Sequence, residues 1–124
     1  MLSHNAMVKA RKLIETLYFG KCTITEHQKV QNPNKTTGFV DVVVLENEPC
    51  RLSFNSTNKA KQTESATSVT QETKVFIAPE IVIKPGSKLT ITQNGKTTNY
   101  KASGMPALYS THQEIVVELF EEWA

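Results

Sequence analysis

The feature that most constrains the fold of this chain is the dipeptide Asn94-Gly95, which lies between two segments of alternating side chains. Residues 88–93 read KLTITQ and residues 96–101 read KTTNYK, and both have the period-two alternation of a half-buried strand. Asn-Gly favours a two-residue turn with positive φ at both positions, and such a turn joins neighbouring antiparallel strands. The sequence therefore predicts a β-hairpin here.

Short segments with a similar strand pattern occur along much of the remaining chain, separated by turns rich in Pro, Asn and Gly. Further strands are expected at residues 22–25, 38–45, 50–54, 74–77, 81–83 and 112–120. Many short strands closed by turns are typical of barrels and sandwiches. The predicted fold is mainly β: a small closed or partly open β-barrel or sandwich of about six to seven antiparallel strands.

The N-terminal segment has the pattern of a helix. Its apolar side chains, Val8, Leu13, Ile14 and Leu17, recur at spacings of three to five, and Gly20 stands where such a helix would stop. We expect an N-terminal helix within residues 1–18. With 124 residues, the chain has the size of a single domain.

Residues 55–73 interrupt the β pattern. They read NSTNKAKQTESATSVTQET, and Val69 is the one sizeable aliphatic residue among these nineteen. Connections in compact domains usually have about 4 to 6 residues, and long structureless ones are commonly functional or disordered. Lengthening a connection from about four residues to nineteen costs only ~1.3 kcal/mol, so the fold tolerates it. We therefore expect a long flexible loop, whose ordering needs partners that a lone subunit does not offer.

No catalytic or metal-binding motif can be drawn from the sequence. His4, His27 and His112 lie in three separate segments without the spacing of a metal site. The five glycines are isolated at turns, which excludes a phosphate-cradling or dinucleotide-binding loop. Cys22 and Cys50 are interpreted as buried apolar residues. We expect no enzyme activity, no metal and no cofactor.

Charge is unevenly distributed, although the net charge is only +2. Residues 1–29 carry five basic and two acidic side chains, whereas residues 113–124 carry four Glu and no Lys or Arg. Such ends could meet in a head-to-tail contact between identical subunits, or they could be two solvated faces that never meet. The candidate contact residues are Lys9, Lys12, Glu118, Glu121, Glu122 and Trp123. Trp123 either caps the barrel or anchors a partner.

The chain lacks the sequence features of a membrane protein. Its longest apolar runs, such as residues 42–45, are far shorter than the ~20 residues of a span, and no basic segment followed by an apolar one opens the chain. We expect a cytosolic protein without a membrane partner.

A barrel that binds single-stranded nucleic acid, like the OB-fold proteins, is the alternative. Such proteins stack bases on exposed aromatic side chains along a basic groove. The low net charge argues against strong binding of this kind. Phe54 and Phe76 are expected to point inward, and Tyr100 and Tyr109 lie among few positive charges. The base-stacking face is therefore expected to be missing.

Several short segments, taken in order, carry a resemblance to a known family. They are residues 48–54 (EPCRLSF), 75–81 (VFIAPEI), 83–87 (IKPGS), the Asn94-Gly95 hairpin and residues 111–115 (THQEI). Over about residues 15–120 their order and spacing resemble the minor capsid, or head-closure, proteins of tailed bacteriophages and prophage-like elements. The resemblance implies a small β-barrel that forms a ring, commonly a dodecamer, in the connector between the head and the tail.

The resemblance also implies a stopper role for the polar loop at residues 55–73. In the family, loops from neighbouring subunits converge on the axis and hold the packaged double-stranded DNA back. The candidate stopper residues are Asn55, Ser56, Asn58, Lys59, Lys61, Gln62, Thr63, Ser65, Ser68, Thr70 and Gln71. Of these, Lys59 and Lys61 are candidates for weak contacts with DNA phosphates.

The partners that the resemblance implies are other copies in the ring, the adaptor and portal proteins, a tail-terminator or tail-completion protein, and the packaged DNA. The expected location is the cytoplasm of a host bacterium during assembly and the head-tail connector of the virion afterwards.

Overall fold

The computed structural model describes residues 3–58 and 69–123. The elements follow one another as α1 (His4–Glu15), β1 (Gly20–Gln31), β2 (Thr37–Asn58), β3 (Val69–Ile77), β4 (Lys88–Gln93), β5 (Lys96–Ala102), β6 (Ala107–Leu108) and β7 (Gln113–Leu119). Every strand pair is antiparallel. The predicted fold class, mainly β with an N-terminal helix, is confirmed.

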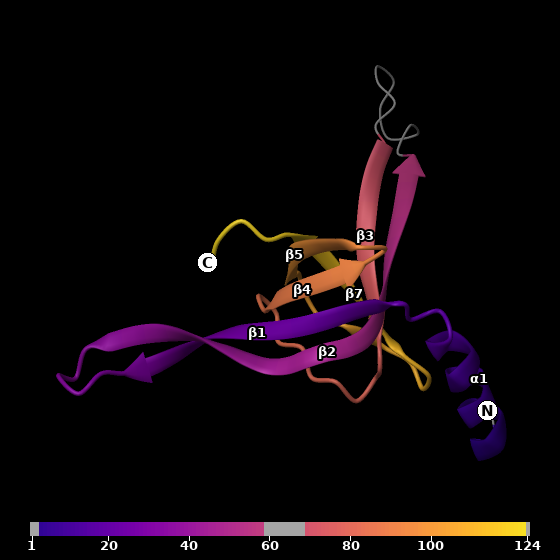
Figure 1. The fold of residues 1–124 in the computed structure, drawn as a ribbon, viewed down its shortest axis with the longest axis horizontal. Helices are drawn as coiled ribbons and strands as arrows, with labels where there is room; N and C mark the ends of the chain where they lie inside the picture. The colour runs from indigo at the N-terminus through magenta and orange to yellow at the C-terminus, as the bar shows by residue number, and fades with distance from the viewer. Residues whose placement is uncertain (1–2, 59–68, 124) are drawn as a thin grey trace.

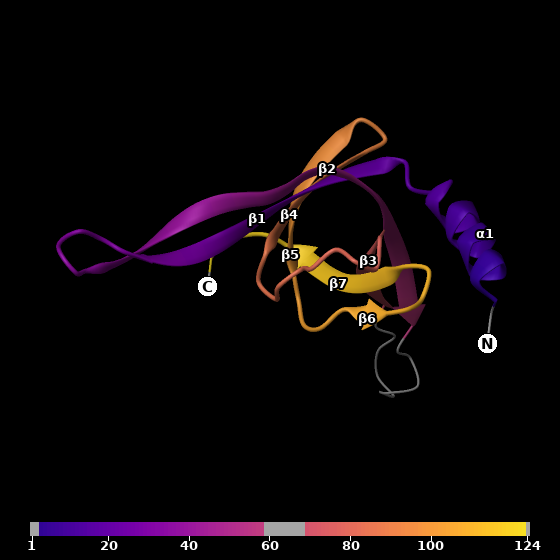
Figure 2. The same ribbon diagram turned by 90° about the horizontal axis from the view of Figure 1, so that it is seen from below.

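The sheet closes on itself to form a barrel. The strand order is β3-β2-β1-β4-β5-β7-β6, and the additional pairing of β3 with β7 joins the two sides (Figure 2). The two-residue strand β6 adds to the same edge of β7 that β5 pairs with further along. Closure satisfies the backbone groups that an open sheet would leave exposed at its edges.

The core lies inside this ring because the strands alternate buried and outward side chains, as the sequence pattern predicts. Its central members include Ile24, Leu89 and Ile115, none of which has exposed surface. Cys22 and Cys50 lie among them and are fully buried, as expected.

Strand β2 is 22 residues long and takes part in both halves of the fold. Its first part pairs with β1 and its second part with β3. Its register with β1 shifts near Ile24, and Asn47 adopts a φ of 52° there, so β2 bulges and bends at this point. The two parts of β2 therefore run in different directions (Figure 1).

Two ribbons extend β2 beyond the barrel (Figure 1). The β1–β2 arm consists of residues 26–31 and 37–42 with the turn between them. The β2–β3 arm consists of residues 55–58 and 69–72. Within the described parts of the chain, the two strands of each arm pair only with each other.

One end of the barrel is plugged by the segment that connects β3 to β4. Gln113, itself buried, donates hydrogen bonds from Nε2 to the carbonyl oxygens of Ala78 (2.8 Å) and Ile81 (2.6 Å). Ile83 from the same segment is buried in the core. The strand predicted at residues 81–83 does not form; the Ile81 carbonyl bonds to the Gln113 side chain and Ile83 packs into the core instead.

Of the other local predictions, some are confirmed and some are wrong. The Asn94-Gly95 hairpin is confirmed, with φ values of 55° and 75° at its two turn residues. The helix forms but ends at Glu15, and Gly20 begins β1 instead of ending the helix. Strand β6 was not anticipated. Within residues 3–58 and 69–123, no helix has the length and apolar character that a membrane crossing requires.

Candidate functional site

The polar stretch at residues 55–73 is partly strand. We expected a loop over the whole stretch, but β2 continues to Asn58 and β3 begins at Val69. The pairs run from Asn55 opposite Glu72 to Asn58 opposite Val69. Strand pairing is possible here because the two segments supply each other with hydrogen-bond partners, which the absence of an apolar pattern had concealed.

The structure places the candidate stopper residues in two groups. Asn55, Ser56 and Asn58 lie on β2, and Thr70 and Gln71 lie on β3, all in the β2–β3 arm. The other candidates lie outside the described residues, namely Lys59, Lys61, Gln62, Thr63, Ser65 and Ser68.

Where this arm leaves the barrel, the barrel has an open end, here called the mouth. Phe54 belongs to the same face of β2 as the buried Cys50 and Leu52, but 53% of its surface is exposed because β2 has already passed the rim. Leu119 at the end of β7 is 64% exposed for the same reason. Together with Tyr100 and others, these side chains line a hollow of about 390 Å³.

Phe76 corrects a second expectation. It lies between the buried residues Val75 and Ile77 and therefore points outward, not inward. Its ring stacks on His112 with the centroids 5.5 Å apart, and Tyr109 stacks on the same imidazole at 4.8 Å. Neither of the two aromatic residues that were predicted to point into the core fills it: Phe54 is exposed, and Phe76 is half-buried on the outer face of β3.

The base of the β1–β2 arm holds a stack of rings that the sequence did not reveal. His27 lies between Phe39 (4.6 Å between centroids) and Trp123 (4.7 Å), and both rings are nearly parallel to it. His27 Nδ1 also lies 2.9 Å from Asp41 Oδ1, and this hydrogen bond lowers the pKa of the Asp41 carboxyl. Trp123 therefore packs against an arm of its own chain and does not cap the barrel.

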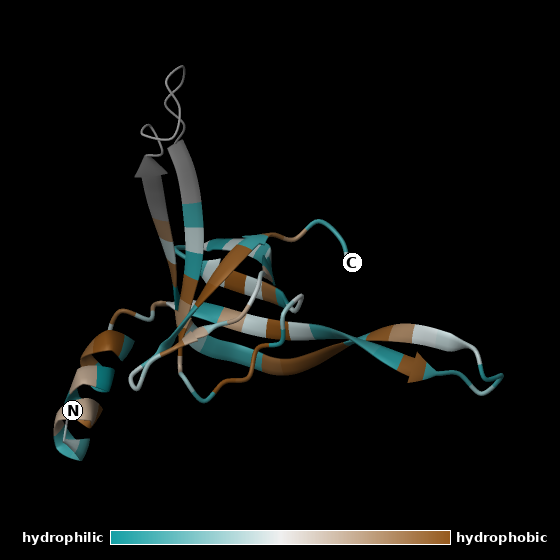
Figure 3. Ribbon diagram, turned by 180° about the vertical axis from the view of Figure 1, so that it is seen from behind, coloured by the Kyte–Doolittle hydropathy of each residue, from teal (hydrophilic) through white to brown (hydrophobic). Residues whose placement is uncertain are grey.

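Helix α1 projects from the barrel. The hydroxyl of Ser3 caps its first turn by accepting a hydrogen bond from the backbone of Ala6 (3.1 Å). None of the described helix residues is buried. Arg11 ties the helix to the plug by pairing with Glu80, and the hydrogen bond from Arg11 lowers the pKa of that carboxyl. Figure 3 shows that the end of α1 near the barrel is hydrophobic.

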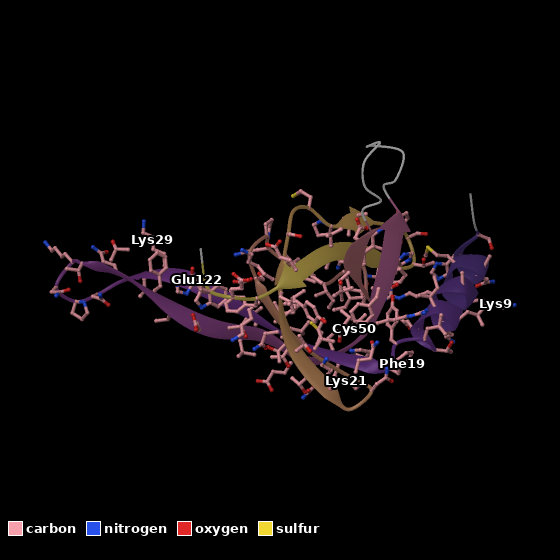
Figure 4. The ribbon with its side chains drawn as sticks, turned by 90° about the horizontal axis from the view of Figure 1, so that it is seen from above. Lys9, Phe19, Lys21, Lys29, Cys50 and Glu122 are labelled. Carbon is pink, nitrogen blue, oxygen red and sulfur yellow. The ribbon has the colours of Figure 1, made fainter. Side chains whose placement is uncertain are left out.

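The two charged surfaces predicted from the sequence lie apart. Lys9 and Lys12 are exposed on α1, while Glu118, Glu121 and Glu122 are exposed on β7 and the tail. In Figure 4, Lys9 lies at one side of the molecule and Glu122 at the other side of the barrel. One chain therefore does not bring these groups together.

Two kinds of reactive site find no support. The hydrogen bond between the two cysteines raises the pKa of the Cys22 thiol, as does burial, and lowers the pKa of the Cys50 thiol. Neither sulfur is exposed, so neither thiol is accessible to a reactant. No group of three or more His, Cys, Asp or Glu side chains suited to a metal ion occurs in the part of the chain that the structure describes.

Sequence reasoning missed several exposed apolar residues. A helix or strand period assigns a side chain to a face, but it does not show whether a neighbouring element is long enough to cover that face. The residues affected are Leu13, Leu17, Phe54 and Leu119. A signal for the helix was present, because Lys9 and Leu13 are spaced by four residues and share a face.

No protein-family model matches the chain, and no curated protein is significantly similar to it in sequence. A solved structure with a similar arrangement is the phage-like element PBSX protein xkdH from Bacillus subtilis. It is 13% identical, with a TM-score of 0.48, and the match covers 80% of this chain and 91% of that one. Similarity at this level assigns no function, so the function is inferred from the chain's own residues.

Proposed function

We propose that this chain is a structural head-closure subunit in the head-tail connector of a tailed phage or a prophage-like element. In this role it forms a ring that closes the head channel, retains the packaged DNA and provides the attachment site for the tail. The observation that supports the proposal most is the β2–β3 arm, which carries the polar stretch away from the barrel as a paired ribbon (Figure 1).

The arm has the chemistry that a stopper needs. Each of its two strands is paired on one edge only within the described residues, which leaves the outer edges available to arms of neighbouring copies. Ser, Thr, Asn and Gln dominate its sequence, so a ring of such arms presents a hydrated surface to DNA. Lys59 and Lys61 would add weak, salt-dependent contacts with phosphates.

The ring would have partners on both sides. The adaptor and portal proteins would lie toward the head, and a tail-terminator or tail-completion protein would lie toward the tail. These contacts belong to the proposal, as does the role of the β2–β3 arm.

The test shortens the arm and leaves the barrel as it is. Replacing residues 57–70 by Asn-Gly joins Ser56 to Gln71, which are paired opposite each other, through a two-residue turn. The shorter connection costs less loop-closure entropy, so the barrel should stay folded. Heads assembled with this variant should lose their DNA, measured as the fraction of filled heads.

The matched control keeps the length and changes the composition. Residues 59–68 are replaced by ten Gly and Ser residues. This variant distinguishes an effect of the length of the arm from an effect of its side chains. If heads with the shortened arm retained their DNA and joined tails normally, the stopper role would be wrong.

Binding of single-stranded nucleic acid is the second candidate, because Phe54 is exposed and Lys96 lines the same hollow. An accessible aromatic ring beside a cation can stack a base, which typically contributes about 1–3 kcal/mol per base. Oligonucleotide affinity that falls steeply with salt and is weakened by Phe54→Ala would support this function. An absence of binding at low salt would exclude it.

A further inference from the structure

The two ends of the barrel differ in how they are covered. At one end the segment between β3 and β4 folds over the core, and Gln113 fixes it by two hydrogen bonds. At the mouth, the inward faces of β2 and β7 continue past the rim to Phe54 and Leu119. No described segment of the chain buries these two side chains.

The mouth combines an apolar interior with a border that is acidic on the side of Leu119 and basic at Lys96. Its hollow of about 390 Å³ includes Leu52, Phe54 and Leu119. Leu119 is shared with a neighbouring hollow of about 430 Å³, which three glutamates, Glu118, Glu121 and Glu122, also line. The one lysine there, Lys101, lies 3.5 Å from Glu118. A segment that fits this surface therefore needs apolar side chains with basic side chains next to them.

Helix α1 has this combination on its outer face. Lys9 and Leu13 are four residues apart and share a face of α1, and Leu17 follows four residues later in the turn just after the helix ends at Glu15. These three residues are here called the row. Leu13 is 70% exposed and Leu17 is 47% exposed, although both are large apolar side chains. Lys12 lies beside this row and is also exposed. The row is therefore an apolar strip with a cationic border.

Helix α1 is held in a position from which it does not reach the mouth of its own barrel. Arg11 pairs with Glu80 of the plug, and Tyr18, which follows the helix, is buried. In Figures 1 and 4, α1 and Lys9 lie on one side of the barrel, and the C-terminal tail with Glu122 lies on the other. The two complementary surfaces thus face away from each other, as a head-to-tail contact requires.

We propose that the row Lys9, Leu13 and Leu17 of one copy packs into the mouth of the next copy. The leucines would cover Phe54 and Leu119, and the lysines would face the acidic border. Because donor and acceptor are different surfaces, each added copy leaves one of each free, so the contact propagates until a ring closes. This inference rests on the proposed ring and names the surfaces that would build it.

The test measures the mass of the full-length protein in solution by sedimentation over a range of concentrations. The wild-type chain should grow beyond a dimer as concentration rises. Leu13→Glu and Leu119→Glu should each remove this growth. Leu108→Glu is the matched control, because Leu108 is 68% exposed but lies on β6. It should associate as the wild type does.

Mixing the two disruptive variants gives a stricter result. The Leu119→Glu chain keeps an intact helix, and the Leu13→Glu chain keeps an intact mouth. A mixture should therefore form a one-to-one dimer and stop there, which also proves that both variants are folded. A wild-type chain that stays monomeric at all concentrations, a mixture without dimer, or a Leu108→Glu chain that loses association would overturn the inference.

The outcome of this association test can be distinguished from the outcome of the shortened-arm test of the stopper role. Rings that still form with Leu119→Glu, together with DNA loss from the shortened arm, would remove the helix-to-mouth contact and keep the connector function. Association of the predicted kind, together with normal DNA retention by the shortened arm, would remove the stopper role and keep the contact.

Discussion

The β1–β2 arm and the β2–β3 arm are two ribbons built from the same strand, yet their positions are fixed by different means. The β1–β2 arm is held by side chains from elsewhere in the chain, since Trp123 stacks on His27 at its base. Its turn closes with backbone hydrogen bonds between Asn32 and Thr36 (2.8 Å) and between Lys35 and Asn32 (2.9 Å).

The β2–β3 arm depends on the barrel itself. Strand β3 pairs with β7 up to Thr73 and then continues into the arm without a break. Lys74 at its base lies between Glu72 (3.4 Å) and Glu114 (3.6 Å), which are surface ion pairs of small energetic value. We therefore expect that removing one side chain loosens the β1–β2 arm, whereas the β2–β3 arm is loosened only when the sheet is disturbed.

The largest expected effect comes from the barrel that both arms share. Ile24→Ala removes a fully buried side chain, which should lower the free energy of unfolding by about 2–5 kcal/mol. Chemical denaturation measures this loss, and Val82→Ala, at an exposed position, is the control and should change stability by less than ~0.5 kcal/mol. Amide exchange should show both arms losing protection together. Protection that survives in either arm would mean that this arm folds on its own.

The second prediction concerns the place where β2 leaves β1 for β3. Gln93 bridges the gap there, since its Oε1 accepts from the Leu52 N–H (2.8 Å) and its Nε2 donates to the Leu52 carbonyl (3.2 Å). Gln93→Ala leaves both backbone groups without these partners and should cost about 1–3 kcal/mol.

The control for this junction is Gln28→Ala, because the Gln28 amide bonds only a side chain of the β1–β2 arm among its described contacts. Gly20→Ala should act like Gln93→Ala, since its added Cβ would lie 2.9 Å from Gln93 Oε1. If Gln93→Ala destabilised the protein no more than Gln28→Ala does, the junction would not depend on this side chain.

The third prediction separates the arms. Trp123→Ala removes the outer ring of the stack on His27 and should cost about 0.5–1.5 kcal/mol. Amide exchange should rise in the β1–β2 arm and stay unchanged in the β2–β3 arm. Tyr109→Ala, which removes a ring from His112 instead, should leave the β1–β2 arm unaffected. Equal exchange in both arms after Trp123→Ala would contradict the difference between them.

The smallest effect is expected from pH. The hydrogen bond with His27 lowers the pKa of Asp41 in the folded chain. Its stabilising contribution is therefore present above the unfolded pKa of the carboxyl and is lost as the pH falls through the folded value. Protection factors in the β1–β2 arm, which correct for the intrinsic pH dependence of amide exchange, should fall in this acidic range, and Asp41→Asn should remove this dependence. If Asp41→Asn left the pH dependence of protection in the β1–β2 arm unchanged, the Asp41 carboxyl would not be its cause.

Much of the fold could be predicted from local chemistry. Asn94-Gly95 demanded a hairpin because few other pairs accept positive φ at both positions, and the structure has that turn. The alternation of the strands also gave the fold class and the burial of Cys22 and Cys50. These features depend on residues close together in the sequence.

The candidate functional site was harder to predict from the sequence, because its residues lie where strands end or leave the barrel. Alternation placed Phe54 on the inward face of β2 but could not show that the barrel ends before it. The strands of the β2–β3 arm carry no apolar pattern, since they have no core to face. The stack of His27 with Trp123 joins residues far apart in the sequence, and no local pattern indicates it.

The separation of arms and barrel also governs how proteins built on this plan can diverge. Adding one residue to each strand of an arm lengthens it by about 3.3 Å and leaves the register inside the barrel intact. A single insertion between Cys50 and Leu52 would instead turn the following inward side chains outward. Natural variation is therefore expected to accumulate as paired changes in arm length, with which the same barrel can carry arms of different reach.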